Sequence, residues 1–304
     1  MQRFIMAVGL PASGKSTWAR KYAEDHHNFV IVSSDEIRAL LGDVNDQSKN
    51  TEVFEIMQRQ TNAALENGYD VIWDATNVSS KHRIGALKQL PKNISINKIC
   101  IIFFTPVWTC KKLNQDRDRQ VPEEVINKMV LNWQTPWYFE GWNEIRVNLS
   151  FLELLSVDDY IDDTFCFNQR NKHHAEPLYL HLNRTASILA NISPILATAG
   201  MLHDWGKLET QVFVDSNGEI SPEAHYYHHE NVGAYKSLFY LGQGLDYIEM
   251  IHVSALITWH MLPFSWETSQ DHKKAKEKFG EQFYNELIEL HYADMEASQD
   301  VFDG

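Results

Sequence analysis

The stretch Gly9-Leu10-Pro11-Ala12-Ser13-Gly14-Lys15-Ser16-Thr17 decides the fold of the first half of the chain. It satisfies the pattern Gly-x4-Gly-Lys-Ser/Thr, in which backbone N–H groups curl around phosphate oxygens at the start of a helix. An apolar run at residues 4–8 precedes it and a helical pattern at residues 16–25 follows it. This strand–loop–helix context predicts a nucleotide-phosphate site at the beginning of an α/β domain.

The same alternation continues as far as residue 149. Short β-rich runs are expected at residues 30–32, 71–73, 99–104 and 144–149, and helices at residues 52–66, 80–90, 108–119 and 122–133. Strands that alternate with helices favour a parallel sheet covered by helices on both faces. Beyond residue 175 the pattern is almost wholly helical, apart from a small hairpin or loop expected at residues 212–220.

Charge divides the chain of 304 residues near residue 150. The net charge is −14, and residues 151–304 hold 24 Asp and Glu against 9 Lys and Arg, whereas residues 1–150 are nearly neutral. Such an acidic chain lacks the basic surface of a non-specific nucleic-acid binder, so a nucleic-acid substrate would be held locally, at its end.

Several features predict a cytoplasmic protein. No apolar run is long enough for a signal peptide or a membrane span, so no membrane partner is expected. The three cysteines, Cys100, Cys110 and Cys166, form an odd, irregular set and are expected to be reduced core residues.

Within the loop, two side chains carry specific chemistry. Lys15 is expected to reach the β- and γ-phosphates, and the Ser16 hydroxyl is expected to bind Mg²⁺. ATP and Mg²⁺ are therefore the predicted cofactors. The predicted phosphate-binding residues are Gly9, Ser13, Gly14, Lys15, Ser16 and Thr17.

Polar residues after the strands distinguish a phosphotransferase from other P-loop proteins. Asp35 follows the second strand, where a carboxylate could take the proton of an acceptor hydroxyl; a helix N-cap is the alternative role. Arg38, one turn later, could hold an anionic part of the acceptor. Asp74 ends the third strand and could assist Mg²⁺ or simply form a turn. Arg117, and less strongly Arg119, could reach the transferring phosphate from a mobile lid or lie on the surface.

These residues resemble the kinase domain of polynucleotide 5′-kinases, the end-healing enzymes of phage and bacterial nucleic-acid repair. The resemblance covers residues 1 to about 149 and is carried by residues 9–20, 33–38, 73–77 and 114–126. It implies that Asp35 is the general base, that Arg38 binds the phosphate on the 3′ side of the acceptor, and that Arg117 is a lid arginine. A further lid arginine common in the family is replaced by Leu113.

A second group of candidate residues surrounds Met201-Leu202-His203-Asp204-Trp205-Gly206-Lys207. Adjacent His203 and Asp204 can grip one metal ion, or the aspartate can bridge two. Imidazole and carboxylate donors suit a transition ion such as Mn, Fe, Co, Ni or Zn. The predicted metal ligands are His181, His203, Asp204, His229, His260 and Asp294.

These segments resemble the HD superfamily of metal-dependent phosphohydrolases over residues ~168–297. The resemblance implies that the first metal is bound by His181, His203, Asp204 and Asp294, and that His229 and His260 complete a second site. Lys207 would steady oxygens of the phosphoester, with a surface lysine as the alternative. His173 and His174 compete with His181 for its role. Four other histidines of this half are expected on helices or the surface: His225, His228, His252 and His291.

Together the two sites predict a bifunctional end-healing enzyme acting on RNA or DNA ends. The kinase would phosphorylate a 5′-OH, the HD domain would remove a 2′,3′-cyclic phosphate or a 3′- or 2′-phosphate, and a ligase would then seal the ends. The predicted domains are an α/β P-loop kinase domain at 1–150, an acidic linker at 151–167 and an all-α HD domain at 168–304. Two alternatives stay open: a small-molecule or nucleoside kinase fused to a nucleotidase, and a non-catalytic nucleotide sensor. The aromatic segment at residues 133–139 either packs inside the protein or stacks on bases.

Overall fold

The computed structural model describes residues 1–42, 48–171, 176–240 and 244–299 and divides the chain into two compact units. Unit 1 comprises residues 1–126 and 136–152, and unit 2 comprises residues 127–135 and 153–304. The chain therefore passes between the units first inside helix α6 (Glu123–Leu131) and not only near residue 150. Two of the histidines considered above, His173 and His174, lie outside the described residues.

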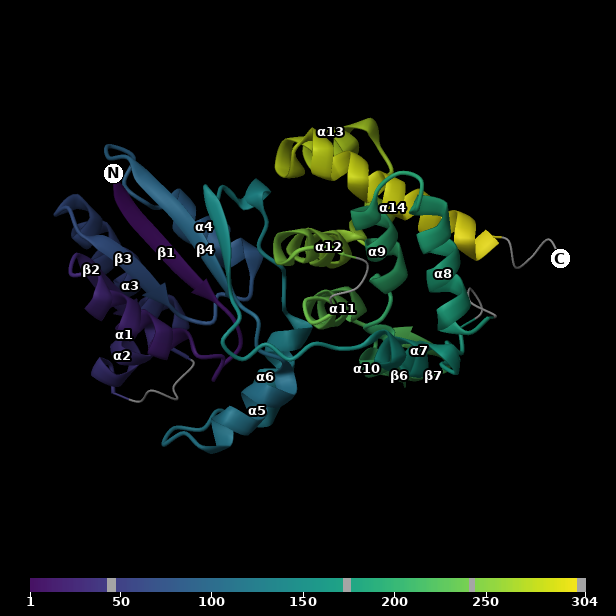
Figure 1. Ribbon diagram of the computed structural model, residues 1–304, viewed down its shortest axis with the longest axis horizontal. Coiled ribbons are helices and arrows are strands. Elements are labelled where there is room, and N and C mark those ends of the chain that lie inside the picture. The colour runs from purple at the N-terminus through teal and green to yellow at the C-terminus, as the bar shows by residue number, and fades with distance from the viewer. Residues whose placement is uncertain (43–47, 172–175, 241–243, 300–304) are drawn as a thin grey trace. The chain divides into compact units, whose positions relative to one another are not determined.

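Unit 1 is an α/β domain with a five-stranded parallel sheet, as predicted (Figure 1). The strand order is β2-β3-β1-β4-β5. The strands are β1 (Gln2–Val8), β2 (Phe29–Ser33), β3 (Asp70–Asp74), β4 (Ile96–Phe103) and β5 (Glu144–Asn148). The helices are α1 (Lys15–Asp25), α2 (Ser34–Leu40), α3 (Asn50–Glu66), α4 (Ser80–Lys88), α5 (Val107–Gln115), the beginning of α6, and the 3-10 turn η1 (Tyr138–Glu140).

The strand register brings the candidate residues of unit 1 to one edge of the sheet. Ala7 on β1 and Ser33 on β2 both pair with Asp74, the last residue of β3. Because all three strands are parallel, the segments that follow them begin at the same level. Ligands of open parallel sheets bind at this carboxyl edge, and the phosphate-binding loop begins there.

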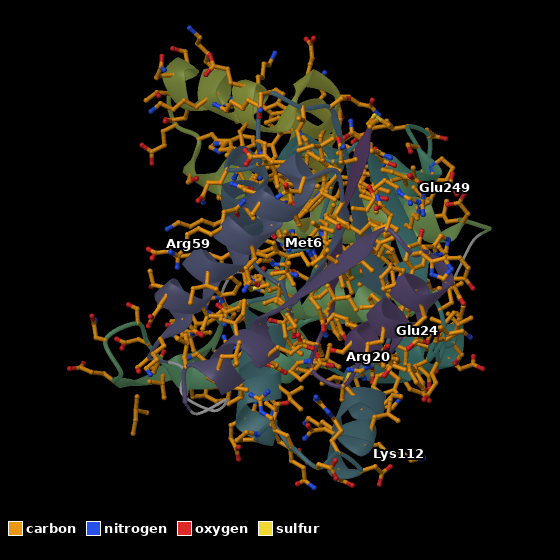
Figure 2. All side chains as sticks on the ribbon, turned by 90° about the vertical axis from the view of Figure 1, so that its left-hand side faces the viewer. Met6, Arg20, Glu24, Arg59, Lys112 and Glu249 are labelled. Carbon is orange, nitrogen blue, oxygen red and sulfur yellow. The ribbon has the colours of Figure 1, made fainter. Side chains whose placement is uncertain are left out.

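The sheet is buried on both faces, which explains why its strands are continuous apolar runs. Ile5 and Ala7 of β1 share one cluster with Ala19 of α1, whereas Met6, of opposite strand parity, is also buried. In Figure 2, Met6 lies in the interior, while the exposed Arg20 of α1 lies toward the surface.

A buried ion pair holds the segment that follows β3. Arg83 donates to Glu140 through Nε (2.8 Å) and Nη2 (2.6 Å), and both side chains have no exposed surface. Its Nη1 donates to the carbonyl of Asn77 at 2.8 Å, and Trp142 Nε1 donates to Glu140 Oε2 at 2.9 Å. A buried pair with this many hydrogen bonds restrains the loop that begins at Asp74.

Unit 2 is mainly helical. Its elements are α7 (Val157–Phe165), α8 (Leu178–Leu189), α9 (Pro194–Leu202), α10 (Lys207–Thr210), β6 (Gln211–Val214), β7 (Ile220–Tyr226), α11 (His229–Ser237), α12 (Tyr247–Trp259), η2 (Leu262–Ser265), α13 (Ser269–Phe279) and α14 (Glu281–Gln299). The expectation of an all-α domain was too simple, because β6 and β7 form an antiparallel pair. The expected turn joins them: Asp215 Oδ1 accepts from the backbone N–H of Asn217 and Glu219.

The acidic segment expected as a linker is helix α7. Ser156 and Asp159 form a capping box at its start. Tyr160 points inward, is 2% exposed, and donates to the carbonyl of Met201 at 3.0 Å. The negative charges suggested a solvated linker, but the apolar positions between them recur at helical spacing and bury one face.

Two further expectations can be compared with the structure. Trp133 is fully buried, donates to Thr135 Oγ1 at 2.9 Å and contacts the Tyr235 ring, so this part of the aromatic segment packs inside unit 2.

All three cysteines are free, but Cys166 is exposed at the end of α7 and was wrongly expected in a core. Over the described residues, no helix has both the length and the apolar character that crossing a membrane demands.

Candidate active sites

The phosphate-binding loop of unit 1 connects β1 directly to α1. Gly14 caps the helix in the left-handed region, with φ of 90°, and a Cβ there would lie 2.9 Å from Phe151 Cε2. Both constraints require glycine at this position. Gly9 and Ser13 lie between β1 and α1, and Ser16 and Thr17 lie in the first turn of α1, in the strand–loop–helix order that the sequence predicts. Free N–H groups at such a terminus favour an anion.

Lys15 is buried at the base of this loop. Its Nζ donates to the Leu10 carbonyl at 2.6 Å and to Ser13 Oγ at 3.1 Å. Burial lowers the pKa of Lys15, and the nearby Asp74 carboxylate opposes that shift. The loop itself thus positions the ammonium group of Lys15. When a phosphate binds in the loop, its oxygens can replace the Leu10 carbonyl and the Ser13 hydroxyl as acceptors.

Asp35 lies between two arginines. Arg119 Nη1 is 2.7 Å from Asp35 Oδ2, and Arg38 Nη1 is 3.5 Å from Oδ1. Arg38 also donates to Asn50 Oδ1 at 2.6 Å. The N-cap of α2 is Ser33, which accepts from the Glu36 N–H, so helix capping is not the role of Asp35.

The other two candidates of unit 1 flank these residues. Asp74 is 6% exposed at the end of β3, and its carboxylate is close enough to Lys15 to act on the pKa of that lysine. Arg117 lies after α5, with its charge near Lys15, whereas Arg119 pairs with Asp35. Sequence analysis favoured Arg117 over Arg119 as a lid arginine and did not identify Asn50. No local pattern indicates that Arg119 pairs with Asp35 or that Asn50 accepts a hydrogen bond from Arg38.

In unit 2, the six predicted metal ligands converge on one buried cluster. They come from five helices or their ends: His181 on α8, His203 and Asp204 after α9, His229 at the start of α11, His260 after α12 and Asp294 on α14. None of the six residues is more than 9% exposed. Segments separated by more than 100 residues therefore supply one donor set.

Asp204 presents its two carboxylate oxygens to two different pairs of histidines. Oδ2 lies 3.7 Å from His181 Nε2 and 3.4 Å from His203 Nε2. Oδ1 lies 3.1 Å from His229 Nε2 and 3.8 Å from His260 Nε2. Each half forms a triad whose ligand atoms lie within 4.8 Å of one another.

Asp294 completes the first half of the cluster. Its Oδ1 lies 3.1 Å from His181 Nε2 and 3.5 Å from His203 Nε2. The two Nε2 atoms are themselves 3.3 Å apart. Ligands held at about 2.0–2.1 Å around a tetrahedral ion are separated by about 3.3 Å, so these spacings fit a transition ion.

Backbone carbonyls set the tautomers of three histidines. Nδ1 of His203 lies 2.8 Å from the Gly200 carbonyl, Nδ1 of His229 lies 2.8 Å from the Tyr226 carbonyl, and Nδ1 of His260 lies 2.7 Å from the Ile257 carbonyl. A carbonyl only accepts, so each Nδ1 carries a proton and each Nε2 is left facing the cluster. Nε2 of His260 is buried and has no hydrogen-bond partner among the described residues.

The electrostatics of the cluster agree with cation binding. Burial disfavours charge on His203, but Asp204 and Asp294 outweigh it and raise the pKa of His203 to about 10. Burial likewise acts against the charged form of Asp204, yet Lys207 and His203 hold the pKa of that carboxyl well below its usual range. A proton on His203 thus partly balances two buried carboxylates, and a bound cation would replace it.

Lys207 is an interior residue of this cluster and not a surface lysine. It is 5% exposed, and its Nζ lies 2.6 Å from Asp204 Oδ2 and 3.0 Å from Gln169 Oε1. The sequence offered no signal for Gln169, which approaches from a distant loop. Of the other histidines, His252 pairs with Glu286 at 2.7 Å and His228 is largely exposed, as expected for residues outside the cluster.

Gly206 fixes the distance between the His-Asp segment and α11. A Cβ at Gly206 would lie 2.2 Å from the His229 carbonyl oxygen and 2.5 Å from the Gly233 nitrogen. Gly206→Ala is expected to destabilise unit 2 by about 1–3 kcal/mol and to weaken metal binding, because α11 carries His229. Thermal unfolding and metal titration measure the two effects. Gly85→Ala is the matched control, since nothing lies within 4 Å of its Cβ; equal behaviour of the two variants would contradict the prediction.

A cavity of about 560 Å³ adjoins the cluster. Asp204, His229 and Asp294 contribute to its lining, as does Lys207. The candidate metal ligands are therefore accessible to a small molecule and not sealed within the helices.

Comparisons with known proteins agree with the architecture of unit 1. Residues 4–136 match the family model described as an AAA domain. This part of the chain is thus a P-loop kinase-like α/β domain with a parallel sheet. The chain is 27% identical over 212 residues to the L-seryl-tRNA(Sec) kinase of Methanococcus maripaludis, covering 65% of this chain and 82% of that protein.

Two solved structures are also similar in part. A chain from the structure of the Pnkp1/Rnl/Hen1 RNA repair complex has 25% identity and a TM-score of 0.38, over 43% of each chain. The crystal structure of a fungal RNA kinase has 16% identity and a TM-score of 0.38, over 53% of this chain and 41% of that chain. The chain thus covers less than half the length of either protein.

Proposed function

We propose that the chain is a bifunctional enzyme that heals the ends of RNA or DNA, with a 5′-OH kinase in unit 1 and an HD-type phosphoesterase in unit 2. The observation that carries the proposal is the carboxylate of Asp204, shared between two histidine pairs. It occurs on the same chain as a phosphate-binding loop with a carboxylate and two arginines nearby.

In the kinase reaction, the loop and Lys15 hold the phosphates of ATP, and Ser16 and Asp74 hold Mg²⁺. Asp35 takes the proton of the acceptor hydroxyl and directs its oxygen at the γ-phosphate. Arg38 holds the phosphate of the acceptor strand, and Arg117 stabilises charge on the transferring group. Arg119, which pairs with Asp35, must release that carboxylate when the acceptor binds.

In the phosphoesterase, His181, His203, Asp204 and Asp294 would hold one ion, and His229 and His260, with Asp204 shared, a second. A divalent transition ion such as Mn, Ni, Co, Fe or Zn supplies Lewis-acid chemistry toward a phosphoester. Lys207 fixes the orientation of the shared carboxylate through its contact with Oδ2. The Nδ1–H bonds to backbone carbonyls hold three imidazoles in the binding orientation.

A kinase and a phosphoesterase that acted on the same small molecule would add and remove the same phosphate without a net result. On the two ends of a broken strand the two activities are complementary, because one end gains a phosphate and the other loses one. A 5′-phosphate and a free 3′ end are the substrates of a nucleic-acid ligase, so a ligase is the proposed functional partner. The test is a short RNA with a 5′-OH and a 2′,3′-cyclic phosphate, incubated with labelled ATP, Mg²⁺ and Mn²⁺ or Ni²⁺. Label should enter the 5′ end and the 3′ end should lose its phosphate. An RNA that emerges unchanged at both ends would refute the proposal.

A second candidate acceptor follows from the curated relative, whose name describes phosphorylation of a seryl group carried on tRNA. In that case the kinase would ignore a 5′-OH and label serylated tRNA. Running seryl-tRNA beside the 5′-OH RNA in the same assay separates the two acceptors.

A further inference from the structure

The lining of the cavity beside the metal cluster has two kinds of residue. One kind is the set of buried charged and imidazole groups described above. The other is a set of large apolar side chains that stay partly exposed: Tyr227 at 42%, Met261 at 41%, Phe264 at 47% and Met295 at 40%. Exposed apolar residues are usually scattered singly on a surface, so their gathering at one cavity indicates a ligand with an apolar part.

The ring of Phe264 is held in place although it is exposed. It lies on η2 and makes an edge-to-face contact with His291, with 4.4 Å between ring centroids and 88° between planes. His291 precedes the candidate ligand Asp294 by three residues on α14, which is about one helical turn. The same turn of α14 therefore supports both the metal cluster and the exposed ring.

A second aromatic pair lines the same cavity. The rings of His225 and Tyr227 are parallel, with an interplanar angle of 1° and 5.7 Å between centroids. They stand close to His229, which begins α11. Aromatic and methionine side chains thus line the cavity, and they come from segments that also carry candidate metal ligands.

We infer that this cavity binds one unpaired terminal nucleoside, with its phosphoester at the histidine–aspartate cluster and its base against Phe264 and Met261. The inference rests on the proposed phosphoesterase function. A volume of about 560 Å³ suits a small molecule of nucleotide size and excludes a duplex. Because every base has an aromatic face and methionine adapts its shape, the site accepts all four bases with little preference.

The test measures binding of adenosine 3′-monophosphate by calorimetry, with every protein carrying Lys15→Ala so that the P-loop does not contribute. Phe264→Ala should weaken binding at least about fivefold, the lower end of the effect of removing a stacking partner. Phe264→Trp should retain it. Phe165→Ala is the matched control, because Phe165 is 58% exposed on α7 and does not line the cavity. The measurement is made on Mn²⁺-loaded and on metal-free protein.

A second readout compares hydrolysis of adenosine 2′,3′-cyclic phosphate with hydrolysis of glycerol 2-phosphate, which has no base. Phe264→Ala should lower kcat/KM for the nucleotide and leave that for glycerol 2-phosphate unchanged. Equal nucleotide binding by Phe264→Ala and Phe165→Ala, or no binding at all, overturns the inference even if esters are hydrolysed. Phe264-dependent binding without hydrolysis of any ester upholds the nucleoside site and overturns the phosphoesterase function instead.

Discussion

Asp35→Asn is expected to lower the kcat of the 5′-kinase by roughly 10²–10⁴-fold, the contribution usual for a positioned general base. The amide keeps the shape of the carboxylate but cannot accept the hydroxyl proton. ATP affinity should stay nearly unchanged, because Lys15 and the loop hold the phosphates through contacts that do not include Asp35. Transfer of label from ATP to a 5′-OH oligonucleotide measures kcat, and equilibrium titration measures ATP binding.

Glu36→Gln is the matched control for this substitution. Glu36 is the next residue of α2, is exposed, and no ion pair involving it is recorded among the described residues. It should retain full activity. If Asp35→Asn is as active as Glu36→Gln, Asp35 serves only to pair with Arg38 and Arg119, and the general base lies elsewhere.

Asp204→Asn is expected to reduce the proposed phosphoesterase activity to the background rate and to remove most bound transition metal, while the kinase stays active. Both proposed ions share this carboxylate, so one substitution removes a ligand from each. It also removes the carboxylate that faces the buried ammonium group of Lys207, at a cost of about 3–5 kcal/mol in folding free energy. Elemental analysis of the purified protein and hydrolysis of the cyclic phosphate measure the two losses, and thermal unfolding measures the third effect.

His260→Gln separates loss of metal from loss of stability. Nε2 of His260 has no hydrogen-bond partner among the described residues, so its removal breaks no hydrogen bond there. The variant should stay folded, lose one of the two proposed ions and lose most phosphoesterase activity. His228→Gln is the control, since His228 is exposed just before α11. A His260→Gln protein with full metal content would show that the second triad does not bind an ion.

Much of the kinase half could be predicted from local sequence. The five strands appear in the sequence as apolar runs because a parallel sheet is buried on both faces, and the phosphate-binding loop is a continuous segment between a strand and a helix. The pairing of Asp35 with Arg119 could not be predicted, because 84 residues of sequence separate the two side chains. Such a contact depends on how the helices after β4 pack, which no local period encodes.

In the second half, residue type identified the donors but not their arrangement. Histidine and aspartate in a helical pattern indicated metal binding, and all six candidates meet in one buried cluster. The burial of Lys207, the helix formed at α7 and the division of the chain inside α6 were not foreseen. Their charges suggested that Lys207 and the α7 segment are exposed to solvent, whereas packing against distant segments buries Lys207 and one face of α7.

Local sequence establishes the chemistry available to this protein: a phosphate-binding loop and a set of imidazole and carboxylate donors. Those properties are local, because they follow from residue types at fixed spacings. Folding, in contrast, directs the two oxygens of Asp204 toward two different histidine pairs and leaves Phe264 exposed at the cavity beside them. These relations join helices far apart in the chain, and the packing that buries their apolar faces sets the distances between them.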